Sequence, residues 1–218
     1  MGTAISNGVA LVLAALTVAL AGAGCGGSSS GSASASASAG SASAGSASAG
    51  SASANTATVH AFGWLRPAAA PRGWTVHRIP AGATLPYPAG WRTITTDPGT
   101  ASAALFASGG RMVGYLNLTP QDGGETLANW VHFRVSHNAE ENDRRLRTIA
   151  AAGRLRFRSG PGTCVQDAYT TTSNARWVEI ACLISGHHGG AVIVGAAPPD
   201  VWTTVAPALE RAISAVTA

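Results

Sequence analysis

The chain has 218 residues, a formal net charge of +4 and three cysteines. It contains no lysine, so all of its 14 Lys and Arg residues are arginine. This small positive excess, behind an apolar leader of the kind that directs export, argues against nucleic acid as a partner. Residues 73–218 are enough for one hydrophobic core, so the composition predicts a single folded domain.

An uncharged apolar run occupies residues 9–20. Crossing about 30 Å of hydrocarbon takes ~20 apolar residues, so the run is too short to span a membrane as a helix. Its length is typical of the apolar region of a signal peptide. We therefore expect residues 1–24 to be a signal peptide.

Four small residues, Ala21-Gly22-Ala23-Gly24, connect this run to Cys25. The segment resembles a bacterial lipoprotein signal, and that resemblance implies cleavage before Cys25 and lipidation of its sulfur. The protein would then sit on the extracytoplasmic face of the cell membrane. The alternative is ordinary cleavage after an Ala-x-Ala such as Ala19-Leu20-Ala21 and secretion, because Gly22 stands where the family pattern prefers leucine.

A Gly/Ser/Ala tract follows the cysteine, and no apolar residue larger than alanine occurs in residues 26–54. Such a segment buries too little surface to offset its ordering entropy. Residues 55–72 are transitional, with scattered aromatic residues and prolines. We predict a lipidated cysteine and a disordered tether over 25–72, and a single α+β domain over 73–218.

The periodicity predicts a succession of strands interrupted by a helix and closed by another. The strands are expected over 74–79, 92–96, 103–107, 112–118, 154–158, 163–171, 176–185 and 190–196. Asp122 and Glu125 have capping-box spacing, which predicts a helix that continues in polar form to about residue 147. A second helix follows Pro198-Pro199-Asp200. Short turns between consecutive strands favour an antiparallel sheet, hence the α+β class.

This order, with Tyr87-Pro88-Ala89-Gly90-Trp91 near the domain start, resembles the PsbP-like fold. The resemblance implies an α/β/α sandwich in which helices flank an antiparallel sheet. Many small lipoproteins of actinobacteria look like this fold, and its members serve mostly as accessory or binding subunits. The resemblance carries over no catalytic motif.

Cys164 and Cys182 are equally spaced from a turn centred on Ser173. Directly opposed positions of an antiparallel pair lie within reach of a disulfide. Exported proteins tend to pair their thiols, and this pairing leaves Cys25 for other chemistry. The alternatives are two buried thiols or a metal pair, although the chain has no Cys-x-x-Cys.

The same register places Asp167 opposite Glu179 and Tyr169 opposite Trp177. Paired carboxylates beside aromatic rings suggest a sugar-type or cation site. The alternative is a shifted register, or an arginine from a neighbouring strand between the two acids. These residues form the candidate binding face, and Trp177 is expected to be partly exposed.

A basic stretch runs through the middle of the domain: Arg144, Arg145, Arg147, Arg154, Arg156 and Arg158. Such a stretch suits nucleic acid, which an exported protein rarely meets, or an anionic lipid or polymer surface. The interpretation we favour is a solvated helix face with pairs such as Glu140 to Arg144 at i,i+4. The spacing of the histidines predicts no metal site.

We therefore expect a lipid-anchored, non-catalytic accessory or binding protein of the cell envelope. Its partners would be the membrane, through the anchor, and an envelope protein or small ligand, with no nucleic acid and no cofactor. One alternative is an envelope glycan hydrolase that uses Asp167 and Glu179. Another is a structural spacer without a ligand.

Overall fold

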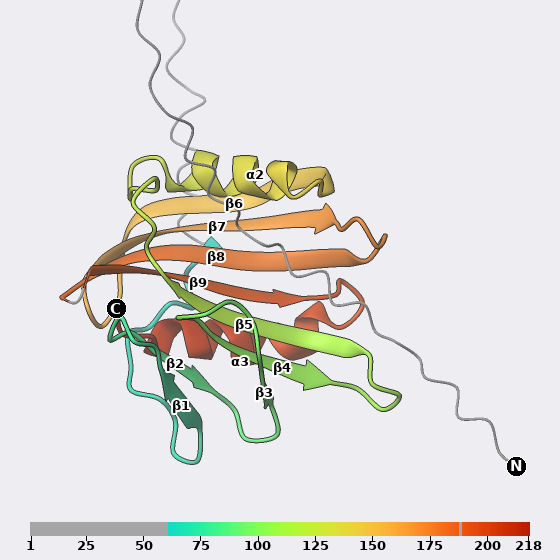
Figure 1. Cartoon of the computed structure of the whole chain (residues 1–218), viewed down its shortest axis with the longest axis horizontal. Helices are drawn as coiled ribbons and strands as arrows, with labels where there is room; N and C mark the ends of the chain where they lie inside the picture. The colour runs from blue at the N-terminus through green and yellow to red at the C-terminus, as the bar shows by residue number, and fades with distance from the viewer. Residues whose placement is uncertain (1–60, 188) are drawn as a thin grey trace, which may run out of the picture.

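The computed structural model describes residues 61–187 and 189–218 (Figure 1). The signal segment, Cys25 and most of the tether lie outside these residues. The elements are β1 (Thr75–Arg78), β2 (Thr84–Tyr87), β3 (Arg92–Ile94), β4 (Ala101–Phe106), β5 (Met112–Pro120), α2 (Trp130–Glu140), β6 (Arg144–Arg156), β7 (Pro161–Thr170), β8 (Arg176–Gly186), β9 (Gly189–Ala197) and α3 (Trp202–Ala215).

The main sheet has seven strands in the order β3-β4-β5-β9-β8-β7-β6, and β1 pairs with β2 in a separate two-stranded sheet. All the pairs are antiparallel. Strands β3 and β6 form the two edges of the main sheet. No helix in the described part of the chain combines the length and apolar character that a membrane span requires.

One helix covers each face of the main sheet (Figure 1). On one face, Leu209 and Ile213 of α3 pack with side chains such as Ile193 of β9. On the other, Trp130 of α2 packs on a second cluster that includes Leu183 of β8. Side chains of a strand alternate between faces, so both clusters draw on the same strands. The α+β class, with an antiparallel sheet between helices, is confirmed.

The folded part begins earlier in the chain than Gly73. Phe62 and Leu65 are buried in the α3-side core, at 3% and 8% exposure. The backbone N–H of Arg66 donates to Ser214 Oγ at 3.3 Å, which ties this segment to the last turn of α3. The described end of the predicted tether, residues 61–72, therefore runs over the domain, and its aromatic and leucine side chains complete the core.

Helix α2 begins later than the capping-box spacing predicts. The N–H of Asp122 does donate to Glu125 Oε1 at 2.7 Å. That contact closes a turn, and the helix starts only at Trp130, with Asn129 as its N-cap. The local signal is thus present, but it stabilises a turn that precedes the helix.

The end of α2 also differs from the prediction. Asn142 has a left-handed backbone with φ of 65°, and the N–H of Asp143 donates to the carbonyl of Asn138 at 3.0 Å. This pattern is a Schellman-type C-cap, which ends a helix. The basic stretch after it forms the edge strand β6, so the predicted polar continuation to residue 147 is wrong, and the proposed i,i+4 pairing across it is lost.

Candidate functional site

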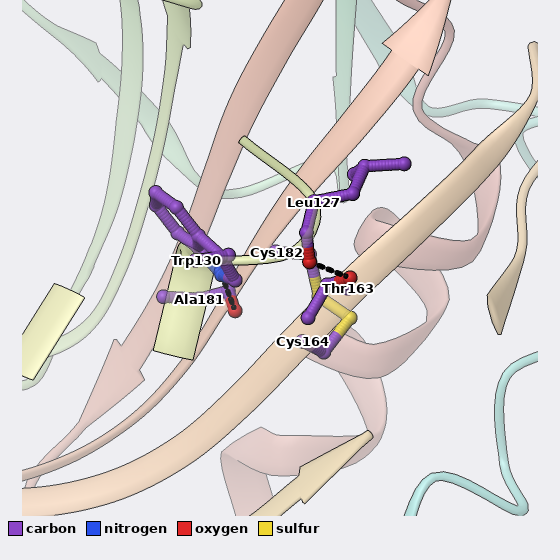
Figure 2. The surroundings of a disulfide bond; sticks show 6 residues. All are labelled: Leu127, Trp130, Thr163, Cys164, Ala181 and Cys182. Carbon is purple, nitrogen blue, oxygen red and sulfur yellow. Dashed lines mark hydrogen bonds between the residues drawn. A yellow bond between two sulfur atoms is a disulfide. The ribbon is translucent and has the colours of Figure 1, made fainter. Parts of the chain in front are cut away.

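The β7–β8 hairpin has the predicted register. Cys164 lies opposite Cys182, and their sulfurs form a disulfide bond (Figure 2). Both residues are fully buried in the α3-side core. Asp167 lies opposite Glu179 in the same register, and Tyr169 lies opposite Trp177.

Two hydrogen bonds fix the start of α2 and the turn before it to this hairpin (Figure 2). Trp130 Nε1 donates to the carbonyl of Ala181 at 3.0 Å. Thr163 Oγ1 donates to the carbonyl of Leu127 at 2.8 Å. Trp130 itself is only 2% exposed. The helix is therefore held against the face of β7 and β8 that carries the two acids.

Arg134 of α2 neutralises Glu179. Its Nε lies 2.7 Å from Glu179 Oε1 and its Nη2 lies 2.9 Å from Oε2, which is a bidentate ion pair. Tyr169 OH donates to Oε2 at 3.1 Å, and Asn138 Nδ2 donates to Oε1 at 3.4 Å. Burial alone would lower the pKa of Arg134, but the charge and hydrogen bonds of Glu179 raise it. The cation that the acid pair requires thus comes from the covering helix.

Asp167 has a different environment from its partner. It is 1% exposed, and neither of its carboxylate oxygens has a hydrogen-bond partner among the described residues. Burial, reinforced by the negative charge of Glu179, raises the pKa of Asp167 to about 8. At neutral pH, Asp167 is therefore mainly protonated, whereas its neighbour Glu179 makes the ion pair with Arg134.

This arrangement is enclosed, which limits what it can do chemically. Glu179 is 0% exposed and Asp167 1% exposed, because α2 lies over both. A glycosidase needs both carboxyl groups in contact with the sugar and the attacking water. The raised pKa of Asp167 thus arises from burial within the fold, and neither acid is open to solvent.

Trp177, the fourth residue of the candidate binding face, is half-buried, whereas the two acids are fully enclosed. It lines an open cavity of about 400 Å³ at one end of the sheet, together with Met112, Pro198 and others. Arg111 and Asp200 also line this cavity, and they form an exposed ion pair at 3.2 Å. Of the predicted face, the two acids and Tyr169 thus form a cluster under α2, and Trp177 lines a cavity.

Sequence reasoning missed the helix residues that complete the acid cluster. Trp130, Arg134 and Asn138 recur every four positions, which places them on one face of α2. An arginine and an asparagine on the same helix face as a buried tryptophan indicate that this face packs against a polar group of the sheet. That signal was available in the sequence, but it did not identify the strand acid.

No group of histidine, cysteine and acidic side chains within residues 61–187 and 189–218 could hold a metal ion. His137 Nε2 instead lies 3.2 Å from Glu141 Oε1, one helical turn away. His188 lies outside the described residues.

Comparisons with known proteins find similarity only among solved structures, since no family model and no curated protein matches the chain. A cyanobacterial PsbP from Synechocystis is 16% identical, with a TM-score of 0.48 over 66% of this chain and 91% of that one. LpqN of Mycobacterium tuberculosis, described as involved in cell envelope biogenesis, is 14% identical, with a TM-score of 0.36 over 66% of this chain and 89% of that one.

A Pseudomonas aeruginosa protein of unknown function, described as a putative regulator, is 13% identical, with a TM-score of 0.44 over 65% of this chain and 94% of that one. At these identities and TM-scores, the similarities carry no inference about ligands or activity. Lipidation and an actinobacterial origin stay predictions.

Proposed function

We propose that the protein is a lipid-anchored, non-catalytic binding or accessory domain on the extracytoplasmic face of the cell membrane. The enclosure of Asp167 and Glu179 beneath α2 is the observation that carries this proposal. These were the residues that the sequence offered for glycan hydrolysis, and a polymer cannot reach carboxyl groups that lack solvent exposure. The contacts of Glu179 with Arg134 and Tyr169, and the burial of Asp167 beside it, support a structural role for the pair.

The disulfide supports the assignment to an oxidising compartment. Cytosolic proteins rarely keep a structural disulfide, whereas exported proteins commonly do. Cys164 and Cys182 pair with each other inside the domain. Cys25 is then the remaining cysteine of the chain, which is the situation expected of a lipid attachment site.

Membrane fractionation combined with intact mass tests the proposal. We expect the wild-type protein in the membrane fraction, truncated before Cys25 and carrying the added mass of a lipid. The Cys25→Ala variant should move to the soluble fraction without that mass. A wild-type protein that is recovered without lipid in the medium, or an unchanged distribution of the variant, would overturn the anchor.

A second readout addresses the accessory role. If the domain does not hydrolyse glycans, Asp167→Asn should have no effect on any glycan turnover measured in purified samples. Activity that copurifies with the wild-type chain and disappears in this variant would restore the hydrolase alternative.

A further inference from the structure

The basic stretch of the sequence lies on an edge of the sheet and not on a helix. Strand β6 runs from Arg144 to Arg156 at the end of the strand order, with β7 as its sheet neighbour. Its arginines, and Arg158 in the turn that follows, are exposed. The i,i+4 partners that would have neutralised them on a helix are therefore not available.

In the part of the chain that the structure describes, these arginines have no ion-pair partner. The ion pairs among the described residues involve Arg111, Arg134 and His137, and none involves an arginine of β6 or Arg158. Residues 1–60 contain no Asp or Glu that could supply a partner. Among the described residues, the arginines of this edge are thus not paired with an acidic side chain.

The end of the strand also forms a concave site. A cavity of about 370 Å³ is lined by the residues around the β6–β7 turn: Arg154, Leu155, Arg156, Phe157, Arg158, Ser159, Gly160 and Pro161. It contains three arginines and no acid, whereas the cavity beside Trp177 contains the Arg111–Asp200 ion pair. Guanidinium groups bind oxyanions bidentately, so the lining of this cavity suits an anionic ligand.

We propose that this edge binds a linear anionic polymer through its oxyanion groups, with the cavity at Arg154, Arg156 and Arg158 as the central contact. The inference deepens the proposed function by giving the anchored domain a class of ligand in the cell envelope. A free phosphate or sulfate would be satisfied by one or two guanidinium groups. A polymer can follow a strand that extends over up to roughly 40 Å.

The register of β6 favours a polymer over a flat membrane surface. Arg147 pairs with Ala168 and so points to the α3 side of the sheet, whereas Arg156 pairs with Pro161 and points to the α2 side. A flexible chain can contact both sides of an edge, but a planar bilayer contacts mainly one.

Bulges and charges on an edge strand also prevent sheet-to-sheet pairing. This role requires the charge of the arginines but no ligand.

The test compares two triple variants of the full chain, purified in detergent without reductant. Arg154→Gln, Arg156→Gln and Arg158→Gln are combined in one variant. Arg72→Gln, Arg78→Gln and Arg211→Gln form the control, which removes the same charge from exposed arginines elsewhere. Long-chain polyphosphate and hyaluronate are the polymer probes, and inorganic phosphate is the monomer control. Unfolding midpoints verify that both variants are folded.

We expect at least a tenfold loss of polymer affinity in the cluster variant and less than a threefold loss in the control. For single-stranded nucleic acids, the logarithm of the binding constant falls with the logarithm of salt concentration by about 0.7 per phosphate contact, so losing three contacts should flatten the slope measured with polyphosphate by about two. Inorganic phosphate should bind far more weakly than either polymer.

Equal losses in the two variants would show that net charge alone attracts the polymer, and the proposed site would be wrong. The wild-type protein could instead bind vesicles that contain phosphatidylglycerol and bind neither polymer. If the cluster variant then loses this vesicle binding, the edge is assigned to the membrane surface. These measurements use purified protein without cells, so their failure leaves the fractionation result on the anchor untouched, and the reverse is also true.

Discussion

Arg134 on α2 and Glu179 on β8 form a bidentate ion pair, with nitrogen–oxygen distances of 2.7 and 2.9 Å, across 45 residues of sequence. The carboxylate is completely buried, and the guanidinium side chain is 14% exposed. The pair therefore links the covering helix to the centre of the sheet. Its geometry allows a direct test of how α2 is held.

Replacing Arg134 alone should destabilise the protein strongly. Arg134→Met leaves the Glu179 carboxylate buried without its cation, which typically costs about 3–5 kcal/mol. The double variant Arg134→Met, Glu179→Met should recover most of that loss, because the methionines pack without unpaired charge. Urea unfolding at pH 7 with the disulfide intact measures the free energies, and Arg72→Met on the surface is the control. A double variant that costs the sum of the two single changes would contradict the coupling.

Stability should fall as pH rises between about 4 and 8, because of Asp167. An unfolded aspartate loses its proton near pH 3.9, whereas burial raises the pKa of native Asp167 to about 8. Between these values the native state binds more protons than the unfolded state, so the free energy of unfolding decreases with pH. The decrease attributable to this residue is at most about 1.4 kcal/mol per pH unit.

Asp167→Asn isolates this effect from the other groups that titrate in the same range, such as Asp143, whose pKa burial raises to about 6. The amide carries no charge at any pH, so the variant should gain stability relative to wild type between pH 5 and pH 9. Urea midpoints at intervals across that range give the comparison. Parallel curves for the two proteins would show that Asp167 does not hold a proton in the native state.

The β7–β8 hairpin was predictable because two local rules fix it. A strand alternates its side chains with a period of two, and a turn sets which residues oppose each other. The turn around Ser173 therefore gave both the Cys164–Cys182 pair and the Asp167–Glu179 pair. The same rules indicated that something must neutralise the acids, but the identity of the cation depends on where α2 lies in space.

The sequence predicts a strand for the end of β6 but a continuing helix for its start, to about residue 147, because edge strands carry weak periodicity. Most residues of β6 are exposed, and bulges interrupt its pairing with β7 at three places. Without a buried face, no alternation of apolar and polar residues distinguishes a strand from a polar helix. The one local signal was Asn142 with Asp143 after α2, which is suitable for a helix C-cap.

The N-terminal boundary was missed for a related reason. Phe62 and Leu65 lie on a single turn, closed by the N–H of Leu65 donating to the carbonyl of Phe62 at 3.0 Å, and irregular chain follows, so the segment is too short to show a periodic pattern. Their burial depends on α3, whose Ser214 accepts from the N–H of Arg66. Contacts between segments so distant in sequence cannot be read from local pattern.

Loss of the disulfide should cost about 3 kcal/mol, which is the chain-entropy value for cysteines 18 residues apart. The variant Cys164→Ala, Cys182→Ala, compared with its parent in urea without reductant, measures this difference. The Cys25→Ala background removes the remaining thiol. In that background the unfolded, unreduced parent should show no reactive thiol, and two reactive thiols would contradict the bond.

Trp91, the last residue of the Pro-x-Gly-Trp turn, packs on Gly114 of β5. A methyl group added at Gly114 would lie 2.9 Å from Trp91 Cη2 and 3.1 Å from Val205 Cγ1. Both neighbours are buried, so neither can move aside freely. Gly114→Ala should therefore cost about 1–3 kcal/mol, the usual range for overpacking a core.

Gly153→Ala is the matched control for this change, because its nearest neighbour would be Thr163 Oγ1 at an ordinary 3.5 Å. Its free energy of unfolding should stay within about 1 kcal/mol of wild type. In a Trp91→Phe background, where the ring is smaller, Gly114→Ala should cost clearly less than in the parent. If the cost of Gly114→Ala is the same in both backgrounds, the tryptophan does not rest on that glycine, and the turn is held to the sheet by other contacts.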